Sequence, residues 1–79
     1  MTTKAYILIE TAVGKSRDVS ATLRALSGVE TVDSVTGPYD IIAVVEAPDL
    51  NAVGDLVTSH IHTIGGIGRT VTCLSVGAG

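Results

Sequence analysis

The segment TGPYDIIAVVEAPD, residues 36–49, places a single carboxylate, Asp40, between a Gly-Pro turn and an apolar run. A turn needs only Gly37 and Pro38. Backbone geometry therefore requires neither Tyr39 nor Asp40. A carboxylate beside free backbone groups suits an amino-acid-like zwitterion, because oxygens hold its ammonium while N–H groups or hydroxyls hold its carboxylate. The structural alternative is that Asp40 bonds its own backbone in the turn and Tyr39 packs.

The remaining polar motifs favour structural roles. His60 and His62 are two residues apart, a spacing that points them to different sides of a helix, and the single cysteine, Cys73, lies on another element. The glycine tract at residues 65–68 leads from a helix into a strand, which is the wrong direction for a phosphate loop. We therefore expect no metal, no cofactor and no catalytic triad.

The chain has 79 residues, enough for one domain, and we expect residues 1–79 to form it. Its composition is 46% hydrophobic and 16% charged, with no Phe or Trp. The apolar content is therefore aliphatic and rich in β-branched residues, which suit strands. A domain this small buries a thin core, so oligomerisation is an expected source of further stability.

Charge and hydropathy exclude several classes of partner. The formal net charge is −3 and the five basic residues form no stripe, so direct nucleic-acid binding is not expected. The apolar runs are far shorter than the roughly 20 residues of a membrane-spanning helix. A lone cysteine closes no internal disulfide, and no signal-peptide pattern opens the chain. These features predict a cytoplasmic protein.

Hydrophobic periodicity predicts the elements that position the turn. Residues 5–11 read as a strand, and residues 16–27 as a helix with Ser16 as N-cap and Gly28 at its C-terminal side. Residues 29–36 and 40–47 read as two strands joined by the Gly-Pro turn, hence as an antiparallel hairpin.

A second helix follows, with Asp49 as N-cap. Its inner face is predicted to carry Val53, Leu56, Val57, either His60 or Ile61, and Ile64. The last strand covers residues 69–76. The order is βαββαβ, which predicts an α+β ferredoxin-like fold with a four-stranded antiparallel sheet and both helices on one face.

The predicted strands are aliphatic in both phases. Ile7 and Ile9 alternate with Tyr6 and Leu8, and residues 41–45 are apolar throughout. A sheet that faced water on one side would show polar residues in one phase. We therefore expect the face without helices to be covered by another subunit.

With this order and the motif VTGPYDIIAVVEA established, the chain resembles the effector-binding domain of the leucine-responsive regulator/AsnC family, also called the RAM domain. The resemblance covers nearly the whole chain, from AYILIET through VSATLRALSGVETVDSVTG to IGGIGRTVTCLSV. The family's G-x-x-D motif appears as GPYD. The resemblance implies the ferredoxin-like fold, pairing through the sheets, and assembly of dimers into larger rings.

The resemblance also implies a site. Family members sense amino acids or related small molecules in clefts between dimers, through the G-x-x-D hairpin and polar positions on the last strand. The corresponding ligand-binding residues here are Gly37, Pro38, Tyr39, Asp40, Thr70 and Thr72. Ile67, Gly68 and Arg69 are close enough in sequence to be wall residues.

The chain departs from the family pattern at its start. Typical members carry a helix-turn-helix domain before this one, whereas here the first strand follows Met1 within a few residues. We therefore expect a stand-alone, non-enzymatic sensor of a small-molecule effector. It would assemble with itself or with a full-length regulator. The alternatives are a small dimeric enzyme of the cofactor-free monooxygenase type, with His60 or His62 as base, and a purely structural oligomer partner.

Overall fold

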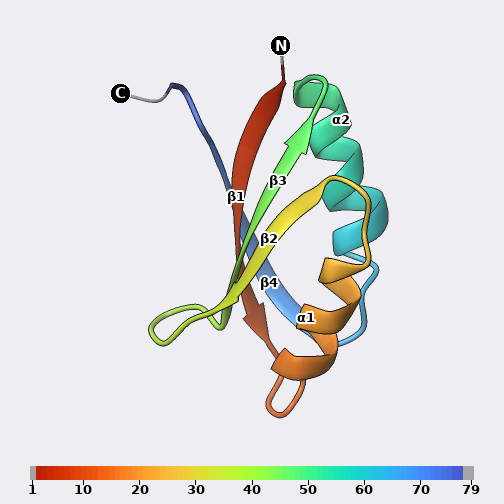
Figure 1. Cartoon of the computed structure of the whole chain (residues 1–79). Coiled ribbons are helices and arrows are strands. Elements are labelled where there is room, and N and C mark those ends of the chain that lie inside the picture. Colours follow the sequence, from red (N-terminus) through yellow and green to blue (C-terminus); the bar gives the residue numbers. More distant parts are fainter. Residues whose placement is uncertain (1, 78–79) are drawn as a thin grey trace.

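The computed structural model describes residues 2–77 as an antiparallel sheet with the helices packed on one side (Figure 1). The elements in order are β1 (Thr3–Thr11), α1 (Ser16–Arg24), β2 (Val29–Ser34), β3 (Ile41–Ala47), α2 (Leu50–Asp55), its π-helical continuation η1 (Leu56–Ile61) and β4 (Ile67–Leu74). The predicted α+β, ferredoxin-like order is confirmed.

The strands lie in the order β2-β3-β1-β4, and every neighbouring pair is antiparallel. β1 and β3 form the centre, and β2 and β4 are the edges. Ile7 lies opposite Ala43 on one side and Thr72 on the other. Because directly opposed residues project on the same face, this register assigns each strand residue to the helix side or to the open side.

The core lies between the sheet and the helices. Aliphatic side chains of the two central strands are fully buried there, and the helices contribute the opposing layer. The buried apolar residues are Ala5, Ile7, Ile9, Val19, Leu23, Val32, Ile41, Ala43, Val45, Val53, Leu56, Val57 and Ile61. Each fully buried Val, Leu or Ile contributes about 1.5–3 kcal/mol of hydrophobic stabilisation, so this layer dominates the folding energy.

The first helix differs from its prediction at both ends. Lys15, not Ser16, occupies the N-cap position, and no side chain caps the helix. The Ser16 hydroxyl instead contacts the hydroxyl of Thr11 at 2.9 Å. The helix ends at Arg24, earlier than predicted. Gly28 has the expected left-handed backbone (φ +92°), where a Cβ would lie 3.3 Å from the carbonyl oxygen of Glu46.

The second helix begins as predicted. The Asp49 carboxylate accepts the backbone N–H of Ala52 at 2.8 Å, which caps the helix. Its second half is π-helical, and the N–H of His62 donates to the carbonyl of Val57 at 2.8 Å. A π-turn widens the helix. Ile61, rather than the alternative His60, faces the core, and His60 is exposed.

Boundaries shift in all four strands, and β3 begins at Ile41 rather than at residue 40. β1 begins at Thr3, and β2 ends at Ser34, before the hairpin closes through the Val35 N–H and the Asp40 carbonyl at 3.0 Å. β4 runs from Ile67 to Leu74 rather than over residues 69–76. Its earlier start follows the bond from the Ala12 N–H to the carbonyl of Gly66, at 2.8 Å.

Candidate functional site

The sheet face turned away from the helices is apolar at its centre (Figure 1). Register places a set of six side chains there, named the open-face patch: Tyr6, Leu8, Ile42, Val44, Val71 and Cys73. Tyr6 and Val71 remain 38% and 37% exposed. Oppositely charged cross-strand pairs flank the patch, Lys4 with Glu46 and Glu10 with Arg69. The predicted apolar character of both sheet faces is confirmed.

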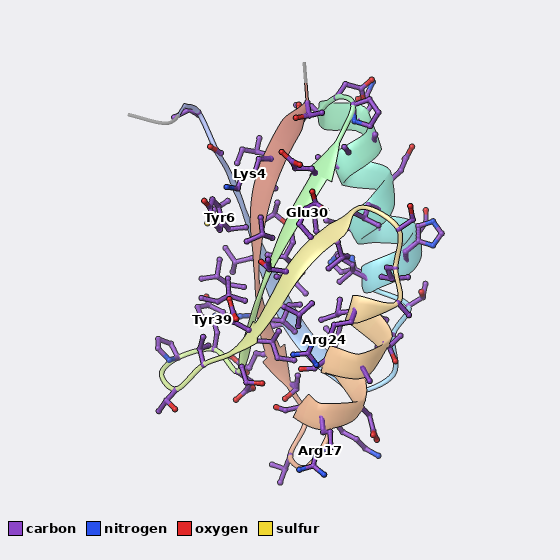
Figure 2. All side chains as sticks on the ribbon, in the orientation of Figure 1. Lys4, Tyr6, Arg17, Arg24, Glu30 and Tyr39 are labelled. Atoms are coloured by element: carbon purple, nitrogen blue, oxygen red, sulfur yellow. The ribbon has the colours of Figure 1, made fainter. Side chains whose placement is uncertain are left out.

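The hairpin between β2 and β3 projects beyond the sheet on the open side (Figure 1). Gly37 has φ +146°, a backbone that favours glycine, and open space surrounds it. Gly37 and Pro38 are exposed, whereas Tyr39 and Asp40 are half-buried. Tyr39 and Tyr6 lie on the same side of the sheet, away from the helices (Figure 2). The hairpin thus borders the open-face patch.

The Asp40 carboxylate is used within the subunit. Its Oδ2 accepts the backbone N–H of Thr11 at 2.8 Å and the hydroxyl of Thr11 at 3.2 Å. Its own N–H donates to the carbonyl of Ile9 at 2.9 Å. These bonds tie the hairpin to the end of β1. Among residues 2–77, no side-chain hydrogen bond uses the other carboxylate oxygen, Oδ1.

Tyr39 contacts the first part of β4. An Arg69 guanidinium nitrogen donates to the Tyr39 hydroxyl at 3.2 Å, and the guanidinium carbon lies 5.8 Å from the centre of the ring. This cation–π geometry is within the usual range. Arg69, predicted only as a wall residue, is therefore the link between the hairpin and the last strand.

The predicted hydroxyls lie on the other side of the sheet. Thr70 and Thr72 oppose Ile9 and Ile7 in the register, so they share the helix side of β4. Thr72 is exposed. The Thr70 hydroxyl lies 2.8 Å from Nε2 of His62, at the end of the second helix. Thr70 therefore forms a hydrogen bond within the subunit. Its partner, His62, was predicted to have a structural role.

Within one subunit the predicted site residues form two groups. The hairpin residues contact Thr11 and Arg69, and the β4 threonines lie beside His62. Central strand β1 separates β3, which follows the hairpin, from β4. Thr11 and His62 were missed as partners. One feature of the sequence could have indicated these two residues. Each stands just before a turn that reverses the chain, at residues 12–15 for Thr11 and at residues 63–66 for His62.

Two cavities accompany these groups. One, of about 310 Å³, is lined by His62, Ile67, Gly68, Arg69 and Thr70. The other, of about 350 Å³, lies between α2 and the connection from α1 to β2, and its polar lining includes Glu46, Asp55 and His60.

The described part of the chain was also searched for metal-binding clusters and for membrane-spanning helices. Within residues 2–77, no cluster of three His, Cys, Asp or Glu side chains is arranged to hold a metal ion. None of the helices formed by these residues combines the length and apolar character needed to cross a membrane.

Comparisons with known proteins connect the fold to a family. A family model described as the Lrp/AsnC ligand binding domain matches residues 4–78. PF0250, an HTH-type transcriptional regulator of Pyrococcus furiosus, is 34% identical over 59 residues, which make up 75% of this chain but 39% of that protein. The chain therefore spans well under half of that regulator's length.

Solved structures give the same result. TTHA0845 from Thermus thermophilus superposes with a TM-score of 0.92 at 34% identity, over 96% of this chain and 95% of that chain. A feast or famine regulatory protein from M. tuberculosis, in complex with L-methionine, superposes with a TM-score of 0.80 at 25% identity. That alignment covers 95% of this chain and 50% of the regulator.

Proposed function

Because the chain belongs to the family of Lrp/AsnC ligand-binding domains, we propose that it is a non-enzymatic module that binds an amino acid or a related small effector and acts through oligomeric assembly. The observation that carries this proposal is the near-complete match to that family, over residues 4–78. The complex of the M. tuberculosis relative with L-methionine supports an amino acid as the ligand class.

Assembly is proposed to proceed through the open-face patch. Removing apolar surface from water is favourable at about 25 cal/mol per Å², and this patch has no cover within the subunit. A two-fold contact brings the same patch of two copies together. The flanking pairs Lys4/Glu46 and Glu10/Arg69 carry both signs of charge, so basic groups of one copy can meet acidic groups of the other.

A second copy of the chain is therefore the proposed binding partner for this patch. The resulting dimers are proposed to associate further. A full-length regulator of the same family is a proposed alternative mate, because it would carry the same kind of sheet face.

The proposed effector contacts are Gly37, Pro38, Tyr39, Asp40, Thr70 and Thr72. Since one subunit splits them between its two sides, we place the effector in a seam between copies. Oδ1 of Asp40 is the proposed partner of the effector's ammonium, because Oδ2 already holds Thr11. An effector bound in a seam shifts assembly only by its difference in affinity for the assembled and dissociated forms.

Regulators among the relatives support a non-enzymatic role. The histidines considered as bases line different cavities, His60 one and His62 the other. Neither cavity contains the hairpin carboxylate Asp40. No observation on these residues favours the monooxygenase-type alternative.

Calorimetry with the standard amino acids, beginning with L-methionine, tests the proposal. Asp40→Asn is the informative variant, because its side-chain carbonyl can still accept the Thr11 N–H while the charge is lost. We expect at least about tenfold weaker binding, the usual cost of losing a charge-assisted hydrogen bond. Asp18→Asn, an exposed carboxylate on α1, is the matched control. Equal binding by both variants would reject the assigned site, and no amino-acid binding by the unmodified protein would reject the function.

A further inference from the structure

The end of β1 holds the hairpin carboxylate more firmly than a turn requires. Oδ2 of Asp40 accepts two bonds from one residue, the backbone N–H of Thr11 at 2.8 Å and the Thr11 hydroxyl at 3.2 Å. The two residues are 29 positions apart in the chain. An Asp that only formed the turn would bond the backbone of that turn instead. The contact between Asp40 and Thr11 is therefore a tertiary one.

The hydroxyl bonds around Thr11 have a defined direction. A carboxylate only accepts hydrogen bonds, and a hydroxyl has a single hydrogen to donate. The Thr11 hydroxyl therefore donates to Asp40, so the Ser16 hydroxyl, which lies 2.9 Å from it, must be the donor to Thr11. These bonds run from Ser16 through Thr11 to Asp40. They use the hydroxyl that was predicted to cap α1.

The position of Thr11 is itself fixed by the turn that follows it. The N–H of Ala12 donates to the carbonyl of Gly66 at 2.8 Å, and the N–H of Lys15 donates to the carbonyl of Ala12 at 3.0 Å. Gly66 also lies close to this turn, since a Cβ added there would be 2.9 Å from Cβ of Lys15. The connection between η1 and β4 thus supports the turn. A rigid support of this kind fixes the orientation of the group that it carries.

The backbone of Asp40 is also held on both sides. Its N–H donates to the carbonyl of Ile9 at 2.9 Å, and its carbonyl accepts the N–H of Val35 at 3.0 Å. These bonds fix the backbone, and the two Thr11 bonds fix the carboxylate. Rotation of the carboxylate would break both Thr11 bonds. The oxygen that stays available for a ligand is therefore Oδ1.

We propose that Thr11 is a positioning residue of the effector site, which holds the Asp40 carboxylate so that Oδ1 is presented to the ammonium group of the effector. The inference deepens the proposed function and rests on it for the role of Asp40. Ordering the side chain before binding removes an entropic cost from the binding step. The Thr11 hydroxyl has already donated its hydrogen to Asp40, so Thr11 acts through Asp40 rather than by donating to the effector.

Calorimetry with L-methionine tests this role. Thr11→Val keeps the shape of the side chain and the backbone N–H but removes the hydroxyl, and we expect binding about three- to tenfold weaker. Thr11→Ser keeps a hydroxyl and should restore most of the affinity. Ser16→Ala is the matched control, because it leaves the Thr11 hydroxyl able to donate to Asp40. It should bind within about twofold of the unmodified protein.

A double-mutant cycle separates positioning from general destabilisation. If Thr11 acts through the charge of Asp40, Thr11→Val should weaken binding by less than about twofold when Asp40→Asn is already present. An equal loss in both backgrounds would show that Thr11 affects binding by another route, which overturns the inference. Binding of L-methionine by Thr11→Val with the affinity of the unmodified protein overturns it as well.

Amide hydrogen exchange measures the anchoring of the hairpin without a ligand. The amides of Asp40 and Val35 form bonds at the base of the hairpin, whereas the amide of Glu46 bonds the carbonyl of Gly28 at 2.9 Å, at the far end of β3. In Thr11→Val we expect the first two amides to exchange about three- to tenfold faster and the Glu46 amide to be unchanged. Unchanged exchange at all three amides would contradict the anchor.

The two proposals fail separately. If Asp40→Asn weakens binding of L-methionine while Thr11→Val leaves binding and exchange unchanged, Thr11 is not a positioning residue and amino-acid sensing stands. If no amino acid binds to the unmodified protein, the proposed function is wrong. Faster exchange in Thr11→Val would then still show that Thr11 holds the hairpin carboxylate.

Discussion

The two faces of the central strands are built from similar residues and have different surroundings. On the helix side, Ile7 and Ile9 are fully buried within the subunit. On the open side, their neighbour Tyr6 is 38% exposed, and Leu8 is half-buried. Side-chain chemistry alone therefore does not distinguish the core from the open-face patch. The two faces differ because the connections between strands place both helices on one face and leave the other face uncovered within the subunit.

This difference predicts two kinds of mutational effect. Substitutions on the helix side should change the stability of the subunit at any protein concentration. Substitutions in the open-face patch should act mainly through assembly, so their effect on thermal stability should depend on protein concentration.

The largest effect is expected at the helix side. Ile7→Ala removes a fully buried side chain and leaves a cavity between the sheet and the helices. We expect the free energy of unfolding to fall by about 2–5 kcal/mol, measured by urea denaturation. Leu8→Ala, one residue along the same strand, is the matched comparison. A loss of under about 1 kcal/mol for Ile7→Ala would show that the helices do not form the main core.

A charge in the open-face patch should come next. Leu8→Lys places an ammonium at the centre of the proposed contact, where each buried leucine contributes about 1.5–3 kcal/mol. Since a two-fold contact carries the change twice, the dissociation constant of the dimer should rise at least about a hundredfold. Sedimentation velocity should detect single chains. Ala21→Lys, on the exposed side of α1, is the control. Equal assembly of both variants would place the contact elsewhere.

A smaller effect is expected at a helix cap. Asp49→Ala removes the bond to the Ala52 N–H, and the free energy of unfolding should fall by about 1 kcal/mol. Assembly should be unchanged, because the cap lies outside the open-face patch. Asp55→Ala, an exposed acid at the end of α2, controls for charge. Thermal unfolding at several protein concentrations measures both quantities, and a concentration-dependent loss specific to Asp49→Ala would contradict the assignment.

The smallest effect is expected where an apolar residue belongs to neither face. Val13 lies in the turn between β1 and α1 and is fully exposed. Val13→Ser should change the free energy of unfolding by less than about 0.5 kcal/mol and leave the sedimentation coefficient unaltered. A clear shift in assembly would extend the contact surface to this turn.

Much of the fold could be predicted because it depends on residues close in sequence. Apolar residues at alternate positions predicted the strands, apolar residues with a 3.6-residue period predicted α1, and Asp49 predicted the start of α2. Ser16 failed as a cap for the opposite reason. Its hydroxyl is taken by Thr11, a residue of the preceding strand, which local propensity does not include.

The candidate site was predicted less completely. The types of its residues indicated a zwitterion site, but the partners of those residues lie far away in sequence. Asp40 bonds Thr11, and Arg69 bonds Tyr39, 29 and 30 residues apart respectively. His62 meets Thr70 only because the glycine-rich connection folds the helix end back onto β4.

By itself, the sequence determined the order of strands and helices, the presence of apolar residues on both strand phases, and the family. These follow from short-range periodicity and from motifs that are local in the chain. The tertiary structure decided which phase the helices cover, which oxygen of Asp40 stays available, and that Arg69 reaches Tyr39 on the open side while Thr70 meets His62 on the helix side. Such features depend on how separate elements pack, and packing is determined by the whole set of contacts rather than by any one segment.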